Sequence, residues 1–195
     1  MPFSAVLDAC VLFPNALRDT LLRLAQAGTY QPLWSERILA EVHGALIRKG
    51  LPESNVTRMV SLARRAFPEA TVTGWESLER SMTNDPKDRH VLAAAVRGHA
   101  HAIVTFNLRD FPLTACEPWD IEPLHPDTFL LHEVECARSV ILNVLKEQAA
   151  ATGKPPRPAM TLEDVLSSLE ICGSPASSPR FDPNSTATSG PGPGR

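Results

Sequence analysis

Apolar and polar positions follow a strand–helix rhythm along roughly the first two-thirds of the chain. Short, apolar, β-branched runs predict buried strands, and apolar residues spaced three or four apart predict helices. The predicted strands cover residues 3–7, 30–34, 70–73, 102–106 and 121–124. The predicted helices cover residues 17–28, 35–49, 53–66 and 86–98, with Asp85 as the cap of the last one. This α/β alternation predicts a parallel sheet with helices on both faces.

The pattern changes after Asp127. Residues 129–150 follow a long helical pattern that a Pro-rich joint ends, and Thr161 and Asp164 predict a capping box for a final short helix. The remainder is rich in Gly, Pro, Ser and Thr, a composition that buries too little apolar surface to become ordered. We therefore expect a domain at 1–126, a helical extension at 127–172 and a disordered tail at 173–195. The extension either packs on the domain or holds a partner.

The amino-acid composition narrows the class of protein to which the chain can belong. Apolar residues make up 43% of the chain and charged residues 21%, as in an ordinary globular protein. The net charge of -3 gives no overall attraction for nucleic acid, and basic pairs such as Arg64-Arg65 are explained by solvated helix faces. The four cysteines form no CxxC pair, and the chain shows neither a signal peptide nor ~20 consecutive apolar residues. We expect a cytoplasmic protein that binds no membrane.

Four carboxylates stand out by their positions. Asp8 follows the first predicted strand, and Asp110 follows the fourth. Asp88 lies in the first turn of a helix, and Glu41 interrupts the apolar stripe of another. Because ligands of open α/β sheets bind beyond the carboxyl ends of the strands, these side chains are candidates for one shared site.

Gathered carboxylates imply a cation. Carboxylates that lie close together repel one another, and the burial of an unpaired one is costly. Oxygen ligands favour a hard ion, Mg²⁺ or Mn²⁺, over zinc. Such an ion activates water and stabilises the oxyanions of a phosphodiester. The pattern therefore favours metal-dependent phosphodiester hydrolysis.

Each acid taken singly has a structural explanation. Asp8 and Asp110 suit turns, and Asp88 suits the dipole of its helix. Glu41 is harder to explain, because an acid in an apolar stripe needs a partner such as Arg37 or His43. The joint occurrence of the four acids in a strand–helix alternation is what favours a site.

Other patterns are weaker. His90, His99 and His101 lie close together in the sequence, and solvated surface is the favoured interpretation. No Gly-rich phosphate loop is present, so nucleotide binding has no support.

Three motifs resemble those of a known family: VLDACVLFP with Asp8, ERILAEV with Glu41, and DPKDRHVLAAA followed by AIVTFNLRDFP. From about Phe3 to Leu124 the chain resembles a PIN-domain ribonuclease, most of all the toxin of a VapBC-type toxin–antitoxin pair. The segment 127–172 resembles a C-terminal extension of one subgroup. The resemblance implies a Rossmann-like sheet of about five parallel strands in the order 3-2-1-4-5.

The resemblance also implies a function. PIN-domain toxins of this type cleave single-stranded RNA with Mg²⁺ or Mn²⁺, form homodimers and are inhibited by a cognate antitoxin. Asp8, Glu41 and Asp88 match the three core acids of the family. Many members carry a fourth aspartate two residues after the strand-end threonine, where this chain has Asn107.

Because Asn107 stands where the family has an acid, the fourth metal ligand has to be another residue. Asp110 is the nearest acid and takes the fourth place as metal ligand and catalytic residue. Thr105 and Asn107 are expected to support the site, the first by hydrogen bonding and the second by orienting metal-bound water. Asp85 is either a helix cap, the favoured role, or a further supporting residue. Two alternative functions remain: a PIN fold that binds without turnover, and a PIN nuclease of RNA maturation.

Overall fold

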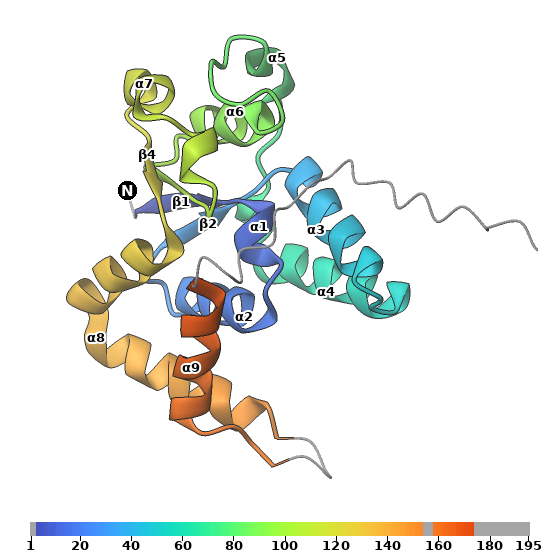
Figure 1. Cartoon of the computed structure of the whole chain (residues 1–195), viewed down its shortest axis with the longest axis vertical. Helices are drawn as coiled ribbons and strands as arrows, with labels where there is room; N and C mark the ends of the chain where they lie inside the picture. The colour runs from blue at the N-terminus through green and yellow to red at the C-terminus, as the bar shows by residue number, and fades with distance from the viewer. Residues whose placement is uncertain (1–2, 154–157, 174–195) are drawn as a thin grey trace, which may run out of the picture.

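The computed structural model describes residues 3–153 and 158–173. A four-stranded parallel sheet in the order β2-β1-β3-β4 forms its centre (Figure 1). The strands are β1 (Ser4–Leu7), β2 (Gln31–Leu33), β3 (Ala102–Val104) and β4 (Glu122–Leu124). β1 and β3 are buried along their whole length, as their apolar sequences predict. Pro123 lies in edge strand β4, where its missing N–H is tolerated.

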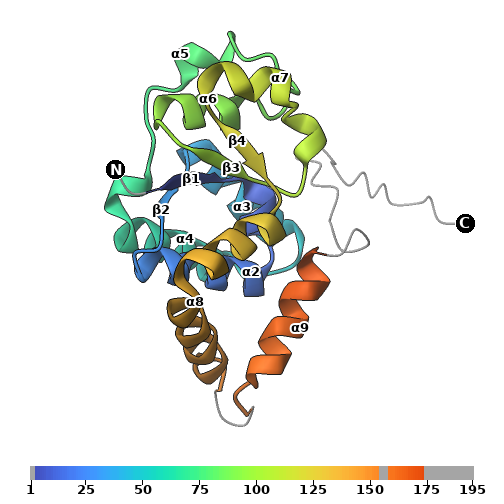
Figure 2. The ribbon, with the colours of Figure 1, turned by 90° about the vertical axis from the view of Figure 1, so that its left-hand side faces the viewer.

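Helices pack on both faces of the sheet. Figure 2 shows α5, α6 and α7 on one side and α2 and α4 on the other. The helices of this part of the chain are α1 (Ala9–Leu12), α2 (Asn15–Gln26), α3 (Glu36–Arg48), α4 (Glu53–Ala66), α5 (Glu76–Glu79), α6 (Arg89–Arg97) and α7 (Leu113–Cys116). The α/β class and the parallel sheet are thereby confirmed.

The prediction of a third strand at residues 70–73 is wrong. Only Thr71 pairs, in a single parallel bridge with Trp34 beside β2. The Pro68–Ala70 segment before it is a short 3₁₀ helix, and Gly74 after it has a φ of +75°. Because the chain turns on both sides of Thr71, only this residue pairs with the strand residues beside it. The sheet therefore has four strands in place of about five, and the bridge lies beside β2, where the third predicted strand was expected.

Helix α6 begins later than predicted. Asp85 does not cap it, because its Oδ1 accepts a hydrogen bond from the Lys87 N–H at 3.0 Å and closes a turn before the helix. Asp88 takes the N-cap position, and its side chain makes no capping hydrogen bond. The carboxylate of Asp88 is thus left for other contacts.

The C-terminal helices α8 (Pro126–Ala151) and α9 (Leu162–Gly173) both contact α2. Gln148 Oε1 accepts a hydrogen bond from Thr20 Oγ1 at 2.7 Å, and Val165 of α9 is buried. The predicted capping box forms, because Thr161 Oγ1 accepts from the Asp164 N–H at 3.1 Å. The extension therefore packs on the core, and the disordered tail predicted at 173–195 lies outside the described residues except for residue 173.

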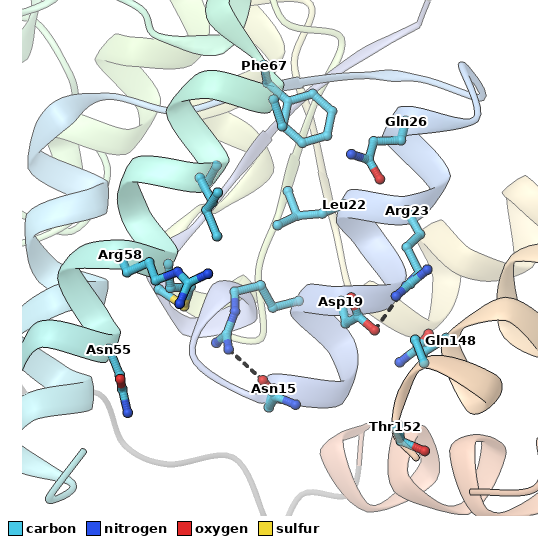
Figure 3. Close-up of a pocket in the computed structure, with 16 residues that line it drawn as sticks. Asn15, Asp19, Leu22, Arg23, Gln26, Asn55, Arg58, Phe67, Gln148 and Thr152 are labelled. Carbon is cyan, nitrogen blue, oxygen red and sulfur yellow. Dashed lines mark hydrogen bonds and ion pairs between the residues drawn. The ribbon is translucent and has the colours of Figure 1, made fainter. Parts of the chain in front are cut away.

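A groove of about 750 Å³ lies between α2, α4 and the end of α8 (Figure 3). Leu22 and Phe67 line it with apolar surface, and an ion pair of 3.0 Å joins Asp19 and Arg23 at its side. None of the four predicted acids lines this groove. Among the described helices, none is long and apolar enough to span a bilayer.

A candidate metal centre of four carboxylates

All four predicted acids line one cavity of about 130 Å³. They reach it from the end of β1, from α3, from the N-cap of α6 and from the 3₁₀ turn Leu108–Asp110 that follows β3. The complete lining consists of Asp8, Cys10, Glu41, Asp85, Lys87, Asp88, Asn107 and Asp110. The fold thus brings together residues that are far apart in the sequence.

Asp8 is the most deeply placed acid, with only 4% of its surface exposed. Its N–H donates to the carbonyl of Val104 at 3.1 Å, which fixes it at the carboxyl edge of the sheet. Its Oδ2 accepts hydrogen bonds from Thr105 Oγ1 at 2.7 Å and from Cys10 Sγ at 3.1 Å. Burial raises the pKa of Asp8, while these hydrogen bonds oppose the rise and the charge of Glu41 adds to it.

Thr105 and Cys10 join the ends of the two central strands. The hydroxyl of Thr105 accepts from the Asn107 N–H at 3.0 Å, and the sulfur of Cys10 accepts from the Phe106 N–H at 3.3 Å. Burial raises the pKa of the Cys10 thiol well above its usual range. The thiol therefore keeps its proton and acts as a donor to Asp8 rather than as a soft metal ligand.

The pKa of Asp88 is strongly raised in this site. Its pKa is raised to about 8, first by burial and then by the negative charges of Asp8, Asp110, Asp85 and Glu41. Burial and the charge of Asp85 raise the pKa of Asp110, while a hydrogen bond to Asp88 and the nearby Lys87 oppose that rise. Five carboxylates, Asp85 included, thus line one cavity with a single cationic side chain, Lys87.

Glu41 has two basic neighbours. Its Oε1 lies 3.6 Å from Arg37 Nε and 3.0 Å from His90 Nε2. His43, the other predicted partner, instead contacts Thr57 Oγ1 at 3.1 Å. His90 is fully buried, so the prediction of solvated surface is wrong for this histidine, whereas His99 and His101 are exposed.

Three further residues of the cavity differ from their predicted roles or were missed. Asp85, favoured as a cap, lines the cavity. Cys10 and Lys87 also line it and were not singled out, although each lies within two residues of a predicted ligand. That proximity inside a motif is the signal that could have identified them.

The donor set fits a hard divalent cation. Carboxylate and amide oxygens are the ligands that Mg²⁺ and Mn²⁺ prefer, and five carboxylates and the amide of Asn107 line this cavity. Within residues 3–153 and 158–173, however, no three His, Cys, Asp or Glu side chains already stand as a metal-binding group. The chemistry of the donors fits the ion, while their arrangement is not that of a preformed cage.

Comparison with known proteins agrees with the motifs. Residues 4–109, just over half of the chain, match the family described as PIN domain. A Mycobacterium tuberculosis protein named "Putative ribonuclease VapC50" is 43% identical over 93 residues, which cover 48% of this chain and 55% of that protein. The chain thus spans about half the length of the curated relative it matches, and no solved structure matches it. The predicted resemblance is confirmed, and the chain belongs to the PIN-domain family.

Proposed function

We propose that the protein is a Mg²⁺- or Mn²⁺-dependent endoribonuclease that cleaves single-stranded RNA and acts as the toxin of a type II toxin–antitoxin system. The observation that carries this proposal is the convergence of Asp8, Glu41, Asp88 and Asp110 on one cavity of a PIN domain. The ribonuclease name of the 43% identical relative supports the reaction, and the VapC part of that name supports a toxin with an antitoxin partner.

The four acids would hold the ion, and each is a proposed catalytic residue. A bound Mg²⁺ or Mn²⁺ would supply water activation and stabilisation of the charge on the phosphodiester. The chain itself fixes Asp8 through the hydrogen bonds of Thr105 and Cys10, so this ligand is oriented before substrate arrives. The carboxamide of Asn107 can both donate and accept hydrogen bonds, which suits it to orient a water molecule at the cavity.

Lys87 brings a positive charge to this acidic cavity. It lines the cavity, is exposed, and opposes the rise in the pKa of Asp110. A phosphate group that approaches the four acids would meet this ammonium, which can stabilise charge that develops on phosphate oxygens. Asp85, in the turn that also carries Lys87, supports the Asp110 backbone by donating its N–H to the Asp110 carbonyl at 3.2 Å.

The test is RNA cleavage by the purified full chain. We expect cleavage of a single-stranded RNA that depends on Mn²⁺ or Mg²⁺, stops with EDTA, and falls by several orders of magnitude in Asp8→Asn. Asp19→Asn is the matched control, because Asp19 is an aspartate of α2 outside the cavity. Cleavage that survives both EDTA and Asp8→Asn would contradict the proposal.

The second candidate is a PIN fold that binds without turnover, favoured by Asn107 in place of an acid. Calorimetry separates the two, because a silent domain should show no micromolar Mn²⁺ site. A nuclease of RNA maturation is distinguished by expression, since only a toxin should arrest growth and be relieved by the product of an adjacent upstream reading frame. Homodimer formation and action in the cytoplasm belong to the same proposal, and light scattering tests the first of them.

A further inference from the structure

Glu41 is the one proposed ligand that comes from the middle of a helix. Its side chain is 17% exposed, and both basic contacts fall on the same oxygen, Oε1. Arg37 lies one turn earlier on α3, whereas His90 belongs to α6. The two contacts therefore approach one carboxylate oxygen from two different helices.

His90 is held in place by its surroundings. The side chain is 1% exposed, and its ring lies 6.0 Å from the ring of Trp75. Its Nε2 is 3.0 Å from Glu41 Oε1, within ion-pair distance, although the two atoms form no hydrogen bond. Within the described chain neither ring nitrogen has a hydrogen-bond partner, and an unsatisfied buried imidazole is costly. The contact with Glu41 is the polar interaction that accounts for a histidine at this place.

Arg37 is tied to a third helix. Its Nη1 lies 2.9 Å from Glu79 Oε1 at the end of α5, while its Nε faces Glu41. This arginine is 43% exposed, so its ion pairs are screened by water. His90 is shielded from water and should therefore contribute more to the position of Glu41 than Arg37 does.

We propose that His90 is a positioning residue for Glu41, with Arg37 and Glu79 as its weaker, solvent-exposed supplement. The buried imidazole holds Oε1, which leaves the second carboxylate oxygen for the cation of the acidic cavity. Residues that orient metal ligands in this way change metal affinity by about 10–100-fold when they are replaced. This inference rests on the proposed function, because it assigns a cation to the cavity.

Calorimetric Mn²⁺ titration of the full chain tests the inference directly. In His90→Leu we expect the Mn²⁺ dissociation constant to rise by about tenfold or more, because nothing then holds Oε1. His90→Gln should restore much of the affinity, since the glutamine amide reaches the position of Nε2. His90→Asn, which is shorter, should not. His43→Leu is the matched control, because His43 lies two residues after Glu41 on α3 but contacts Thr57.

Kinetics give a second measurement that a purely structural role would not move. At saturating Mn²⁺ the turnover number of His90→Gln should approach that of the wild type. In His90→Leu the Mn²⁺ concentration that gives half-maximal rate should be higher than in the wild type. If thermal melting shows that His90→Leu does not fold, the comparison of His90→Gln with His90→Asn decides. Glu79→Gln, a change at the end of the short helix α5, should weaken Mn²⁺ binding by no more than a few-fold.

The outcomes separate the two proposals. If the wild type binds Mn²⁺ and His90→Leu or His90→Asn binds it equally well, the positioning role is overturned and the proposed function stands. If the wild type shows no Mn²⁺ site at all, the proposed function fails and this inference fails with it.

Discussion

At the scale of single residues, the site is governed by the electrostatics of gathered carboxylates. Asp8 is stabilised by two side-chain donors, whereas Asp88 has mainly acidic neighbours. Burial alone raises the pKa of a carboxyl, and neighbouring negative charges raise it further. Asp88 therefore holds its proton in the metal-free protein up to about pH 8. A cation would reverse this preference.

The first prediction concerns the stability of the metal-free protein against pH. An unfolded aspartate loses its proton near pH 3.9. The folded Asp88 keeps its proton to about pH 8, so between these values the folded state binds more protons than the unfolded state. Stability should therefore fall as the pH rises from about 4 to about 8, and level off above it.

Thermal melting of EDTA-treated protein from pH 5 to pH 9 measures this effect. Asp88→Asn should flatten most of the fall, and Mn²⁺ should raise the melting temperature of the wild type more at pH 8 than at pH 6. A melting temperature that rises with pH in this window, or a fall that Asp88→Asn leaves unchanged, would show that the pKa of Asp88 is not raised.

Sequence patterns could identify the acids and the supporting Thr105, but not the supports Cys10 and His90. Asp8 and Asp110 follow strands, so their positions are read from local periodicity and the topology of the fold. His90 and Cys10 acquire their roles by packing against residues far away in the chain, Glu41 and Thr105 respectively. No local pattern distinguishes a buried histidine of this kind from a solvated one.

At the scale of elements, helix α6 places Asp88 and His90 and depends on close packing at its end. Gly98 follows the helix with ordinary backbone dihedrals, but a Cβ there would lie 2.9 Å from Val72 Cγ2 and 3.1 Å from the carbonyl of Ala94. Val72, which follows the bridging residue Thr71, thus packs closely against the end of α6. The late start of α6 and the reduction of the predicted third strand to one bridge both arise from turns whose geometry depends on tertiary contacts.

The second prediction tests that packing. Gly98→Ala should destabilise the protein by about 1–3 kcal/mol, because the added methyl group overpacks a buried contact. Chemical denaturation of the metal-free protein gives the difference in the free energy of unfolding. Gly44→Ala on α3 is the matched control, since its Cβ would meet only the end of the Arg48 side chain at 3.3 Å. Gly44→Ala should be neutral or stabilising by up to about 1 kcal/mol. Equal effects of the two substitutions would contradict the account of Gly98.

At the scale of the whole molecule, the C-terminal helices complete the core of the PIN domain. Phe129 of α8 is buried, and its ring packs edge-on against Tyr30 at 4.9 Å. The sequence predicted both helices from periodicity and a capping box, but left open whether they pack on the domain or hold a partner. In the structure α8 and α9 pack on α2 of the domain and on each other. Which helix faces fit together in this way cannot be read from a single sequence.

The third prediction separates stability from the site. Phe129→Ala should cost about 3–5 kcal/mol in the free energy of unfolding, because it leaves a cavity beside Tyr30. The Mn²⁺ affinity of the folded fraction should not change, because no residue of α8 lines the cavity. Leu131→Ala on the same helix is the control, since Leu131 is 63% exposed and its loss should change stability by no more than about 0.5 kcal/mol. A weakened Mn²⁺ site in folded Phe129→Ala would show that α8 takes part in the metal centre.

The central claim is that four carboxylates of a PIN domain hold a hard divalent cation. The most direct measurement is a crystal of the full chain soaked in Mn²⁺, with the ion located by its anomalous scattering. We expect one or more Mn²⁺ ions in the cavity, with oxygen ligands that include Asp8 and Asp88 at about 2.0–2.6 Å. Crystals that bind Mn²⁺ only elsewhere, or show none in this cavity at millimolar concentration, would contradict the claim.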